Sequence, residues 1–348
     1  MIDADGHDVI NDKHDLKACI QPEHRTTLSS FSSETPWILE MAITFVSAAT
    51  LVAIISFLRS VDAWVPFSNT PLRKSPLNSS YQEEIIQCLD ESVERMNQVM
   101  TTEFFASSPA LSAMQVQCVQ RIEIKESSIP RAGRGLFAKN NIQKGTIISF
   151  YPAHALGIDD GLSSPLFRSL PHDEEYFASH PCSESSYLHC TDQPLFQRTS
   201  ILSPVVTGHL FLDVNPHRDR VGAWVSHLIN DGAVVTSNTV QGVLDYYHAS
   251  GKRRNCIHIP WGPSPVMATV TTKKVKKGEE FLTSYGGTYW LGVLLDVRGE
   301  EGIEIVPEIQ AKIHESAKDL VKSMKAASTL YAEQEKAFRT EFDKLKPS

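Results

Sequence analysis

The sequence predicts an α+β protein in which a mainly β region is flanked by α-helices. Between 119 and 290, strand-like runs are joined by a Gly turn at 133–135 and a Lys-Lys-Gly turn at 276–278. On either side, over 81–100 and 307–346, apolar residues recur at helical spacing among charged ones. The 348-residue chain is 41% hydrophobic and 8% aromatic, which is enough to fill a core.

The first 80 residues divide into three segments by composition. Residues 1–40 begin with a polar stretch rich in Asp and His, and we expect disorder because little apolar surface can offset the chain entropy. Residues 41–58, MAITFVSAATLVAIISFL, carry no charge and are long enough to cross a bilayer or to form a signal segment. Residues 59–80 form a linker or a transit-like segment that is rich in Ser, Pro and basic residues.

Two interpretations of residues 41–80 stay open. In the first, 41–58 is a transmembrane helix, and Arg59 and the basic residues after it place the rest of the chain in the cytoplasm. In the second, Met41 is the true start and cleavage before Trp64 exposes a transit-like stretch. This second arrangement resembles the bipartite plastid leaders of algae with secondary plastids. The expected location is therefore a membrane or a plastid.

Helical segments are predicted on both sides of the β region. Residues 81–118 form the helical segment before it, with an amphipathic helix over 81–100, a linker over 101–118, and strands from about Val119. Residues 291–348 form the helical region after it, with one or two long helices. These C-terminal helices either cap the β region or bind a partner helix, and capping is the simpler interpretation.

Charge and cysteine usage exclude several classes of protein. The formal net charge of -8 argues against direct nucleic-acid binding, because phosphate neutralisation requires clustered Lys and Arg, and it suits a basic protein partner better. The six cysteines form no CxxC pair, so neither structural zinc nor a disulfide framework is expected. The best candidate group of metal ligands consists of His180, Cys182, His189 and Cys190. Its spacing fits no familiar zinc pattern, so no bound metal is expected.

Three separated blocks contain the candidate functional residues. In block 128–150, Gly133 and Gly135 open a tight turn, which lets the backbone approach a ligand closely. In block 211–233, Asn230 and the acid after it are polar side chains in apolar surroundings, whose hydrogen bonds a ligand could satisfy. Block 266–290 ends in an aromatic cluster. Each block alone also fits a plain structural role, as a hairpin turn, an Asn-Asp-Gly turn or core packing.

In this order the blocks resemble the SET domain of protein lysine methyltransferases. The matching segments are GRGLFA at 133–138, KGTIISFY at 144–151, LINDG at 228–232 and GEEFLTSYG at 278–286. The resemblance assigns residues 119–290 to a mainly β SET-domain fold, also called a β-clip, with flanking α-helices. It also implies that a threaded C-terminal segment brings Asn230 and Tyr285 together.

The resemblance implies a function as well as a fold. A SET-domain methyltransferase moves a methyl group from S-adenosyl-L-methionine to the amine of an accessible lysine in a protein substrate. Tyr285 is then the active-site tyrosine, and Tyr289 and Trp290 stack on the adenine or close the lysine channel. The residues implied to bind the cofactor are Gly133, Arg134, Gly135, Asn230, Asp231, Tyr289 and Trp290.

The sequence departs from the family pattern in the INHS-like segment, which the resemblance places at the cofactor pocket. Asp231 stands where the family usually has His, and Gly232 and Ala233 replace Ser and Cys. An anion beside a sulfonium either strengthens binding or marks a pocket that has lost its function. A register that pairs Ser226 and His227 with the Asn-His position loses the LIN match.

Other departures limit what the resemblance implies. Thr283 stands where many relatives carry a second aromatic residue, so the number of methyl groups added cannot be predicted. The cysteine-rich segments that flank many histone-directed SET domains are missing, which weakens a chromatin role. The histidines of the insertion from about 152 to 208 are assigned no catalytic role. The alternative function is a non-catalytic SET-like binding or scaffold module.

Overall fold

A computed structural model describes residues 79–159, 166–180, 182, 189–191, 209–218, 222–263, 265–287, 289–291 and 307–345. The predictions for 1–40 and 41–58, and for all but the last two residues of 59–80, lie outside these ranges. Within them, no helix combines the length and the apolar composition needed to cross a bilayer.

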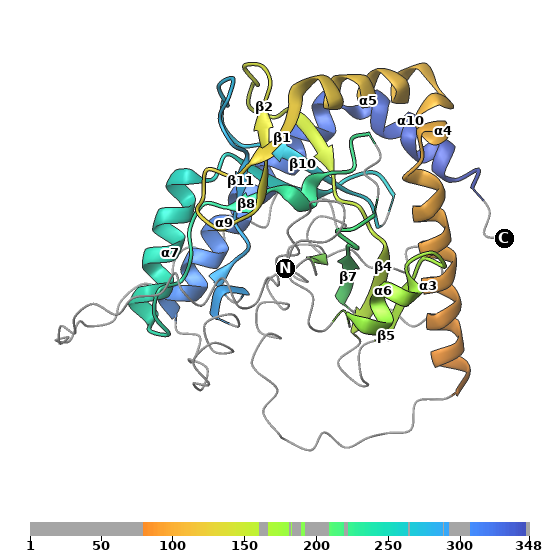
Figure 1. The fold of residues 1–348 in the computed structure, drawn as a ribbon, viewed down its shortest axis with the longest axis horizontal. Coiled ribbons are helices and arrows are strands. Elements are labelled where there is room, and N and C mark those ends of the chain that lie inside the picture. Colours follow the sequence, from red (N-terminus) through yellow and green to blue (C-terminus); the bar gives the residue numbers. More distant parts are fainter. Residues whose placement is uncertain are drawn as a thin grey trace, which may run out of the picture.

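The predicted α+β architecture, with small sheets between flanking helices, is confirmed (Figure 1). The helices are α3 (Ser79–Val99), α4 (Thr102–Ala106), α5 (Pro109–Arg121), α6 (Glu174–Ser179), α7 (Val240–Arg253), α9 (Pro307–Leu330) and α10 (Ala332–Phe342), with a 3-10 helix, η3, at Ser226–Leu228. The strands are β1 (Ile122–Glu126), β2 (Arg134–Ala138), β3 (Ile147–Phe150), β4 (Ala155–Asp159), β5 (Leu166–Ser169), β6 (His189–Thr191), β7 (His209–Asp213), β8 (Asn230–Asp231), β9 (Cys256–Pro260), β10 (Met267–Thr271) and β11 (Leu282–Thr283).

The described strands form four small sheets. β1 pairs with β2 as an antiparallel hairpin, and β3, β10 and β9 lie in that order in a second antiparallel sheet. The insertion predicted after 152 contributes to an antiparallel sheet of order β5-β4-β7-β6. β8 and β11 form a separate parallel pair. The other strand pairings among the described residues are antiparallel, so the parallel pair is the arrangement that distinguishes this fold.

The predicted linker over 101–118 is wrong, because two capped helices occupy this stretch. The Thr101 hydroxyl accepts a hydrogen bond from Phe104 N at 3.2 Å and begins α4, and the Ser108 hydroxyl accepts one from Leu111 N at 3.2 Å and begins α5. Such caps satisfy amide groups that the first turn of a helix leaves unpaired. Since α5 continues to Arg121, the first strand begins at Ile122 and not at Val119.

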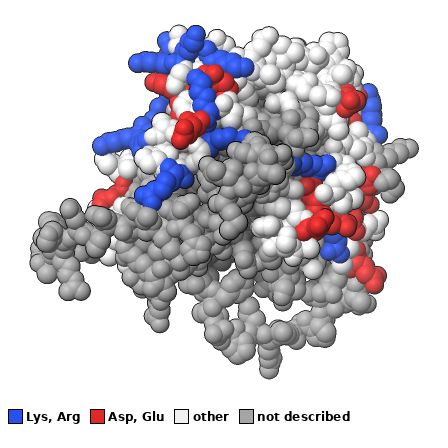
Figure 2. Space-filling model, in the orientation of Figure 1, with Lys and Arg blue, Asp and Glu red and all other residues white. Residues whose placement is uncertain are grey.

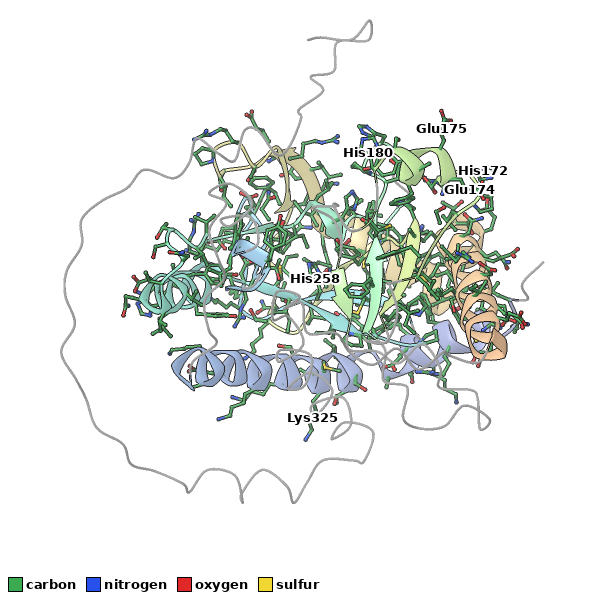
Figure 3. The ribbon with its side chains drawn as sticks, turned by 90° about the horizontal axis from the view of Figure 1, so that it is seen from below. His172, Glu174, Glu175, His180, His258 and Lys325 are labelled. Atoms are coloured by element: carbon green, nitrogen blue, oxygen red, sulfur yellow. The ribbon has the colours of Figure 1, made fainter. Side chains whose placement is uncertain are left out.

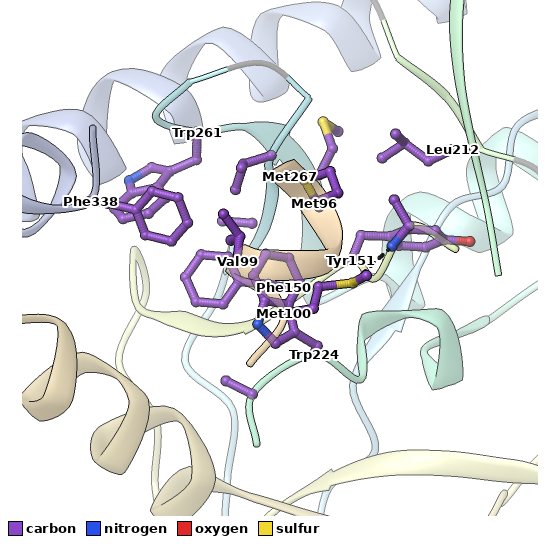
Figure 4. Packing of buried hydrophobic residues seen from close by; sticks show 14 of the residues in the cluster. Met96, Val99, Met100, Phe150, Tyr151, Leu212, Trp224, Trp261, Met267 and Phe338 are labelled. Atoms are coloured by element: carbon purple, nitrogen blue, oxygen red, sulfur yellow. Dashed lines mark hydrogen bonds between the residues drawn. The ribbon is translucent and has the colours of Figure 1, made fainter. Parts of the chain in front are cut away.

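A large hydrophobic core joins the N-terminal helices, the β3-β10-β9 sheet and the C-terminal helices (Figure 4). Phe338 of α10 is fully buried, with its ring centroid 4.9 Å from that of Phe104 and 5.2 Å from that of Trp261. The Tyr331 hydroxyl, between α9 and α10, accepts a hydrogen bond from Ile147 N at 2.9 Å. The C-terminal helices therefore pack on the β region, as the capping interpretation predicts.

A second, smaller core lies beneath the segments that resemble the SET motifs. It joins β2, η3, the 139–146 loop and the 272–281 segment, and its buried members are Ile122, Leu136, Ala138, Ile142, Ile148, Val225, Leu228, Ile229, Cys256, Val275 and Phe281. Three of these buried apolar residues adjoin a residue of the candidate site in the sequence. Leu136 follows Gly135, Ile229 precedes Asn230, and Phe281 follows Glu280. Burial of the apolar neighbours fixes where the polar side chains lie.

The insertion contains a buried ionic cluster. Asp173, which is 1% exposed, accepts a hydrogen bond from Asn215 Nδ2 at 2.8 Å and pairs with the guanidinium of Arg218. The backbone N–H of Asn215 donates a hydrogen bond to Nδ1 of His154 at 2.9 Å. Burial lowers the pKa of His154 to about 4, and the positive charge of Arg218 adds to the shift while Asp173 opposes it. His154 is therefore neutral and satisfied inside the protein at neutral pH.

Candidate functional site

The β8–β11 pair brings together residues that are far apart in the sequence. Leu282 lies opposite Asn230, and Thr283 lies opposite Asp231. Immediately after β11, the Tyr285 amide donates to Asp231 Oδ2 at 2.8 Å, and the Tyr285 hydroxyl donates to the carbonyl oxygen of Ile229 at 2.9 Å. The structure thus joins the LINDG and SYG segments through both strand pairing and side-chain hydrogen bonds.

The Gly turn lies beside this pair. Gly133 is exposed and has a φ of 65°, a left-handed conformation that favours glycine. Gly135 is buried, and a Cβ at this position would overlap Oε1 of Glu280 and approach Nδ2 of Asn230 to 3.3 Å. The turn therefore requires glycine twice, at Gly133 for its backbone angle and at Gly135 for its contact with neighbouring polar side chains.

A buried carboxylate connects the Gly turn to β8. Glu280 is 6% exposed, and its Oε2 accepts hydrogen bonds from the amide and the hydroxyl of Ser128, at 2.8 and 2.5 Å. Its Oε1 accepts from the Ser127 hydroxyl at 2.7 Å and from Asn230 Nδ2 at 3.1 Å. We call Glu280, Ser127, Ser128 and Asn230 the Glu280 network. All of these contacts come from donors, so they satisfy an ionised carboxylate.

The side-chain amide of Asn230 is used inside the protein. Besides Glu280, Nδ2 donates to the carbonyl oxygen of Arg134 at 3.2 Å, so both amide hydrogens have acceptors. This geometry ties β8 to the Gly turn. Asn230 therefore holds the turn from within the protein, while Gly133 and Arg134 stay exposed.

A second buried carboxylate, Asp231, organises the segment around Tyr285. Its Oδ2 accepts hydrogen bonds from the Tyr246 hydroxyl at 2.6 Å, the Tyr285 amide at 2.8 Å and Trp290 Nε1 at 2.9 Å. Its Oδ1 accepts from the Ala233 amide at 3.1 Å and the Ser250 hydroxyl at 3.3 Å. We call these residues the Asp231 network.

The protonation states in the Asp231 network follow from burial. Burial raises the pKa of Asp231, and the hydrogen bonds from Tyr246, Trp290, Tyr285 and Ala233 oppose that rise. Burial and the charge of Asp231 both raise the pKa of Tyr246, which keeps its hydroxyl protonated and able to donate. The hydrogen bonds therefore favour the ionised form of Asp231 against the effect of burial, and the Tyr246 hydroxyl stays protonated as one of the donors.

Two aromatic rings lie beside Tyr285, the active-site tyrosine predicted from the sequence. The Tyr285 ring is 37% exposed and lies parallel to that of Trp290, with a centroid distance of 6.1 Å and an angle of 15°. Tyr289 meets both rings edge to face, at 5.0 and 5.1 Å. Trp290 is buried, so the cluster presents Tyr285 and Tyr289 toward its accessible side.

Helix α7 supplies functional candidates that the sequence analysis missed. The Tyr246 hydroxyl accepts a hydrogen bond from the Gly286 amide at 2.9 Å, and that of Tyr247 accepts one from the Gly287 amide at 3.2 Å. These two neighbouring tyrosines hold the turn after Tyr285. The spacing of Val243, Tyr246, Tyr247 and Ser250 on a capped helix is the signal that could have placed them.

The role of Glu280 was not predicted from the sequence either, although Glu280 lies within the GEEF segment at 278–281. Sequence gives no reason to choose Glu280 over Glu279, since only the structure distinguishes the buried carboxylate from the exposed one. The alternative register is not the one that meets the Gly turn, because Asn230 contacts Arg134 while Ser226 bonds to Thr269 in the interior at 2.5 Å.

The histidines labelled in Figure 3 lie in two separate parts of the fold. Figure 3 places His172, Glu174, Glu175 and His180 around α6, well separated from the central His258. His258 pairs with the Thr269 hydroxyl at 2.8 Å. Among the described residues, no group of three or more His, Cys, Asp and Glu side chains is arranged to hold a metal ion.

A basic surface adjoins the hairpin that contains the Gly turn. The antiparallel bridge between Ile142 and Val275 brings two Lys-bearing loops together, and blue side chains gather at the upper left of Figure 2. Exposed members of these loops are Lys139, Lys144, Lys274, Lys276 and Lys277. Lys side chains therefore gather at this edge of the described fold, with acidic side chains among them in Figure 2.

The Gly turn, the parallel β8–β11 pair and the tyrosine after it define a SET-type domain. Residues 133–286 match the family model of the SET domain, and this match supports a lysine methyltransferase in general. A comparison with curated proteins found no match.

The comparison with solved structures found two SET-domain proteins among its matches. The SET domain of the RIZ1 tumor suppressor (PRDM2) is 13% identical, with a TM-score of 0.25 and coverage of 54% of this chain and 87% of that chain. ATXR5 in complex with a mono-methylated histone H3.1 is 14% identical, with a TM-score of 0.30 and coverage of 69% of this chain and 91% of that chain. The family assignment rests on the family model.

Proposed function

We propose that this protein uses S-adenosylmethionine to methylate a lysine amine in a protein substrate. The observation that carries the proposal is the convergence of the Gly turn, Asn230 and Tyr285 at the β8–β11 pair. The family match supports it over this same stretch of chain. In the proposed complex the cofactor supplies an electrophilic methyl group.

The residues present are compatible with such a cofactor. The exposed turn at Gly133 and Arg134 offers backbone groups, while the Glu280 network fixes that turn from behind. Tyr289 and Trp290 offer aromatic surface close to Tyr285, which suits an adenine ring or the stem of a lysine. We propose these groups as the cofactor-binding residues, with Asn230 acting by holding the turn.

Tyr285 is the proposed catalytic residue. Its hydroxyl donates to the carbonyl oxygen of Ile229, and we propose that the phenol oxygen, which can also accept a hydrogen bond, accepts one from an N–H of the substrate amine. That contact orients the nitrogen lone pair, and orientation is a large part of the rate advantage for a reaction between two bound partners. Tyr285 therefore acts by positioning the amine.

Deprotonation of lysine must precede transfer, because an ammonium group has no lone pair. The reference pKa of lysine is about 10.4, and a water-poor aromatic channel disfavours the charged form. Deprotonation needs no dedicated catalytic base, since the lysine amine can lose its proton to solvent before it enters the active site. The rate is expected to rise with pH over the neutral and mildly alkaline range.

The experiment that tests the proposal is transfer of label from methyl-labelled S-adenosylmethionine to a library of lysine-containing peptides by the full chain. We expect labelling by the wild type, and a loss of at least about tenfold in Tyr285→Phe, which keeps the ring but removes the hydroxyl. Labelling that is unchanged in Tyr285→Phe would contradict the role of the hydroxyl. A folded wild type that labels nothing would favour the alternative, a non-catalytic SET-like binding or scaffold module.

A further inference from the structure

We infer that Asp231 is a positioning residue, whose carboxylate holds Tyr285 and Trp290 in place by contacts within the protein. The inference rests on the proposed function for its link to methyl transfer. Asp231 is the residue by which this chain departs from the usual Asn-His pair of the family, so its role does not follow from the resemblance.

The first step of the argument is the direction of the hydrogen bonds. Both oxygens of Asp231 receive only donors: Oδ2 faces a phenol, a backbone amide and an indole N–H, and Oδ1 faces an amide and the hydroxyl of Ser250. A side chain that carries its own donor at either position must oppose at least one of these groups. The site therefore specifies a carboxylate, rather than merely tolerating one.

The second step is where those donors lie. Two of them, the Tyr285 amide and Trp290 Nε1, belong to the segment after β11 that contains the aromatic cluster. A third, the Tyr246 hydroxyl, belongs to α7 and in turn accepts from the Gly286 amide. One oxygen of Asp231 thus connects β8, α7 and the aromatic segment.

The third step is the accessibility of Asp231. The residue is 5% exposed, and its two oxygens are surrounded by the five protein donors. The Tyr285 hydroxyl bonds instead to Ile229, so the carboxylate reaches the catalytic residue through its backbone. Asp231 thus acts on Tyr285 and Trp290, with no contact to a cofactor required.

The test compares Asp231→Asn with wild type in the full chain. Asn has nearly the same shape, but its NH2 group must face donors in either orientation. Hydrogen exchange of peptide 284–290 reads the position of the aromatic segment without any need for activity. We expect this peptide to exchange at least about tenfold faster in Asp231→Asn, since hydrogen bonds to a charged group are lost.

Kinetics with the labelled cofactor and the peptide library supply the second readout. A positioning role predicts that kcat falls at least about tenfold, while KM for S-adenosylmethionine rises no more than it does in Trp290→Phe. The matched control is Asp245→Asn, an exposed carboxylate on α7 that accepts a hydrogen bond from Gln241 at 2.7 Å. This control is expected to match wild type in both readouts.

The outcomes separate the inference from the proposed function. Unchanged exchange in a folded Asp231→Asn protein overturns the inference, as does a KM increase beyond that of Trp290→Phe with kcat preserved, which would mark a direct cofactor ligand. If the wild type transfers no label but exchange still accelerates in Asp231→Asn, the proposed function fails while the structural positioning by Asp231 stands.

Discussion

Gly135 and Glu280 are in such close contact that no side chain can be added to the glycine without displacing the carboxylate. Glu280 cannot move freely, because Ser127, Ser128 and Asn230 hold both of its oxygens. The second glycine of the GxG turn is therefore required by packing inside the protein. This requirement is separate from any contact with a ligand.

Gly135→Ala is expected to destabilise the protein by about 1–3 kcal/mol, because overpacking of a well-ordered interior forces its neighbours to shift. Chemical denaturation of the full chain measures this free energy of unfolding. The control is Gly251→Ala in α7, where a Cβ meets nothing within 4 Å and the helix gains up to about 0.5 kcal/mol. Equal stability of the two variants would contradict the packing account of Gly135.

Glu280→Gln is expected to lower the free energy of unfolding by about 1–3 kcal/mol, since its NH2 group must oppose at least one of the donors that the carboxylate accepts. Loss of the Glu280 network should also weaken cofactor binding through disorder of the Gly turn. Thermal melting with and without S-adenosylmethionine measures both effects. Glu279→Gln is the matched control, because Glu279 is exposed, and a similar loss in both variants would refute the special role of Glu280.

His154 should make stability depend on pH below neutrality. Its pKa is about 4 in the folded protein, below its value of about 6.5 when unfolded, so its contribution is complete above pH 6.5 and is lost as pH falls through 4. The full loss is roughly 3 kcal/mol. Denaturation midpoints between pH 7 and pH 4 measure it.

The matched variants for this pH dependence are His154→Asn and His172→Asn. The amide oxygen of Asn can replace Nδ1 as an acceptor for the Asn215 amide without titrating, so the slope between pH 6.5 and 4 should decrease in His154→Asn. His172 is exposed, and its replacement should leave the slope as in wild type. An identical slope in all three proteins would show that His154 does not titrate as described.

Phe338→Ala should destabilise the whole fold by about 3–5 kcal/mol, because the ring is fully buried among aromatic residues of the large core. Urea denaturation measures the change. Leu330→Ala, at a position that is 61% exposed, should change stability by no more than about 0.5 kcal/mol. A comparably small effect of Phe338→Ala would mean that α10 is not part of the core.

The sequence predicted the elements whose patterns are local. The amphipathic spacing over 81–100 and 307–346 corresponds to α3 and to α9 with α10, and the ordered motifs correctly indicated the SET family. The prediction of one or two helices over 307–346 left their division open, and the helical caps at Thr101 and Ser108 were not predicted. Caps depend on single hydroxyl groups, which hydrophobic periodicity does not detect.

The candidate site was predictable only as a set of motifs. Asn230 and Tyr285 were expected to meet, and the structure joins their segments, but the partners of Asp231 and Glu280 come from α7 and from Ser127 and Ser128. Such contacts across long sequence separations depend on the complete fold. The membrane and plastid interpretations of 41–80 stay predictions.

The most direct measurement of the central claim is isothermal titration of the full chain with S-adenosylmethionine. The account predicts saturable binding at one site per chain, which persists in Tyr285→Phe and weakens in Glu280→Gln because the Gly turn loses its support. No binding by a wild-type protein that melts cooperatively would contradict the claim that this SET domain is a working methyltransferase.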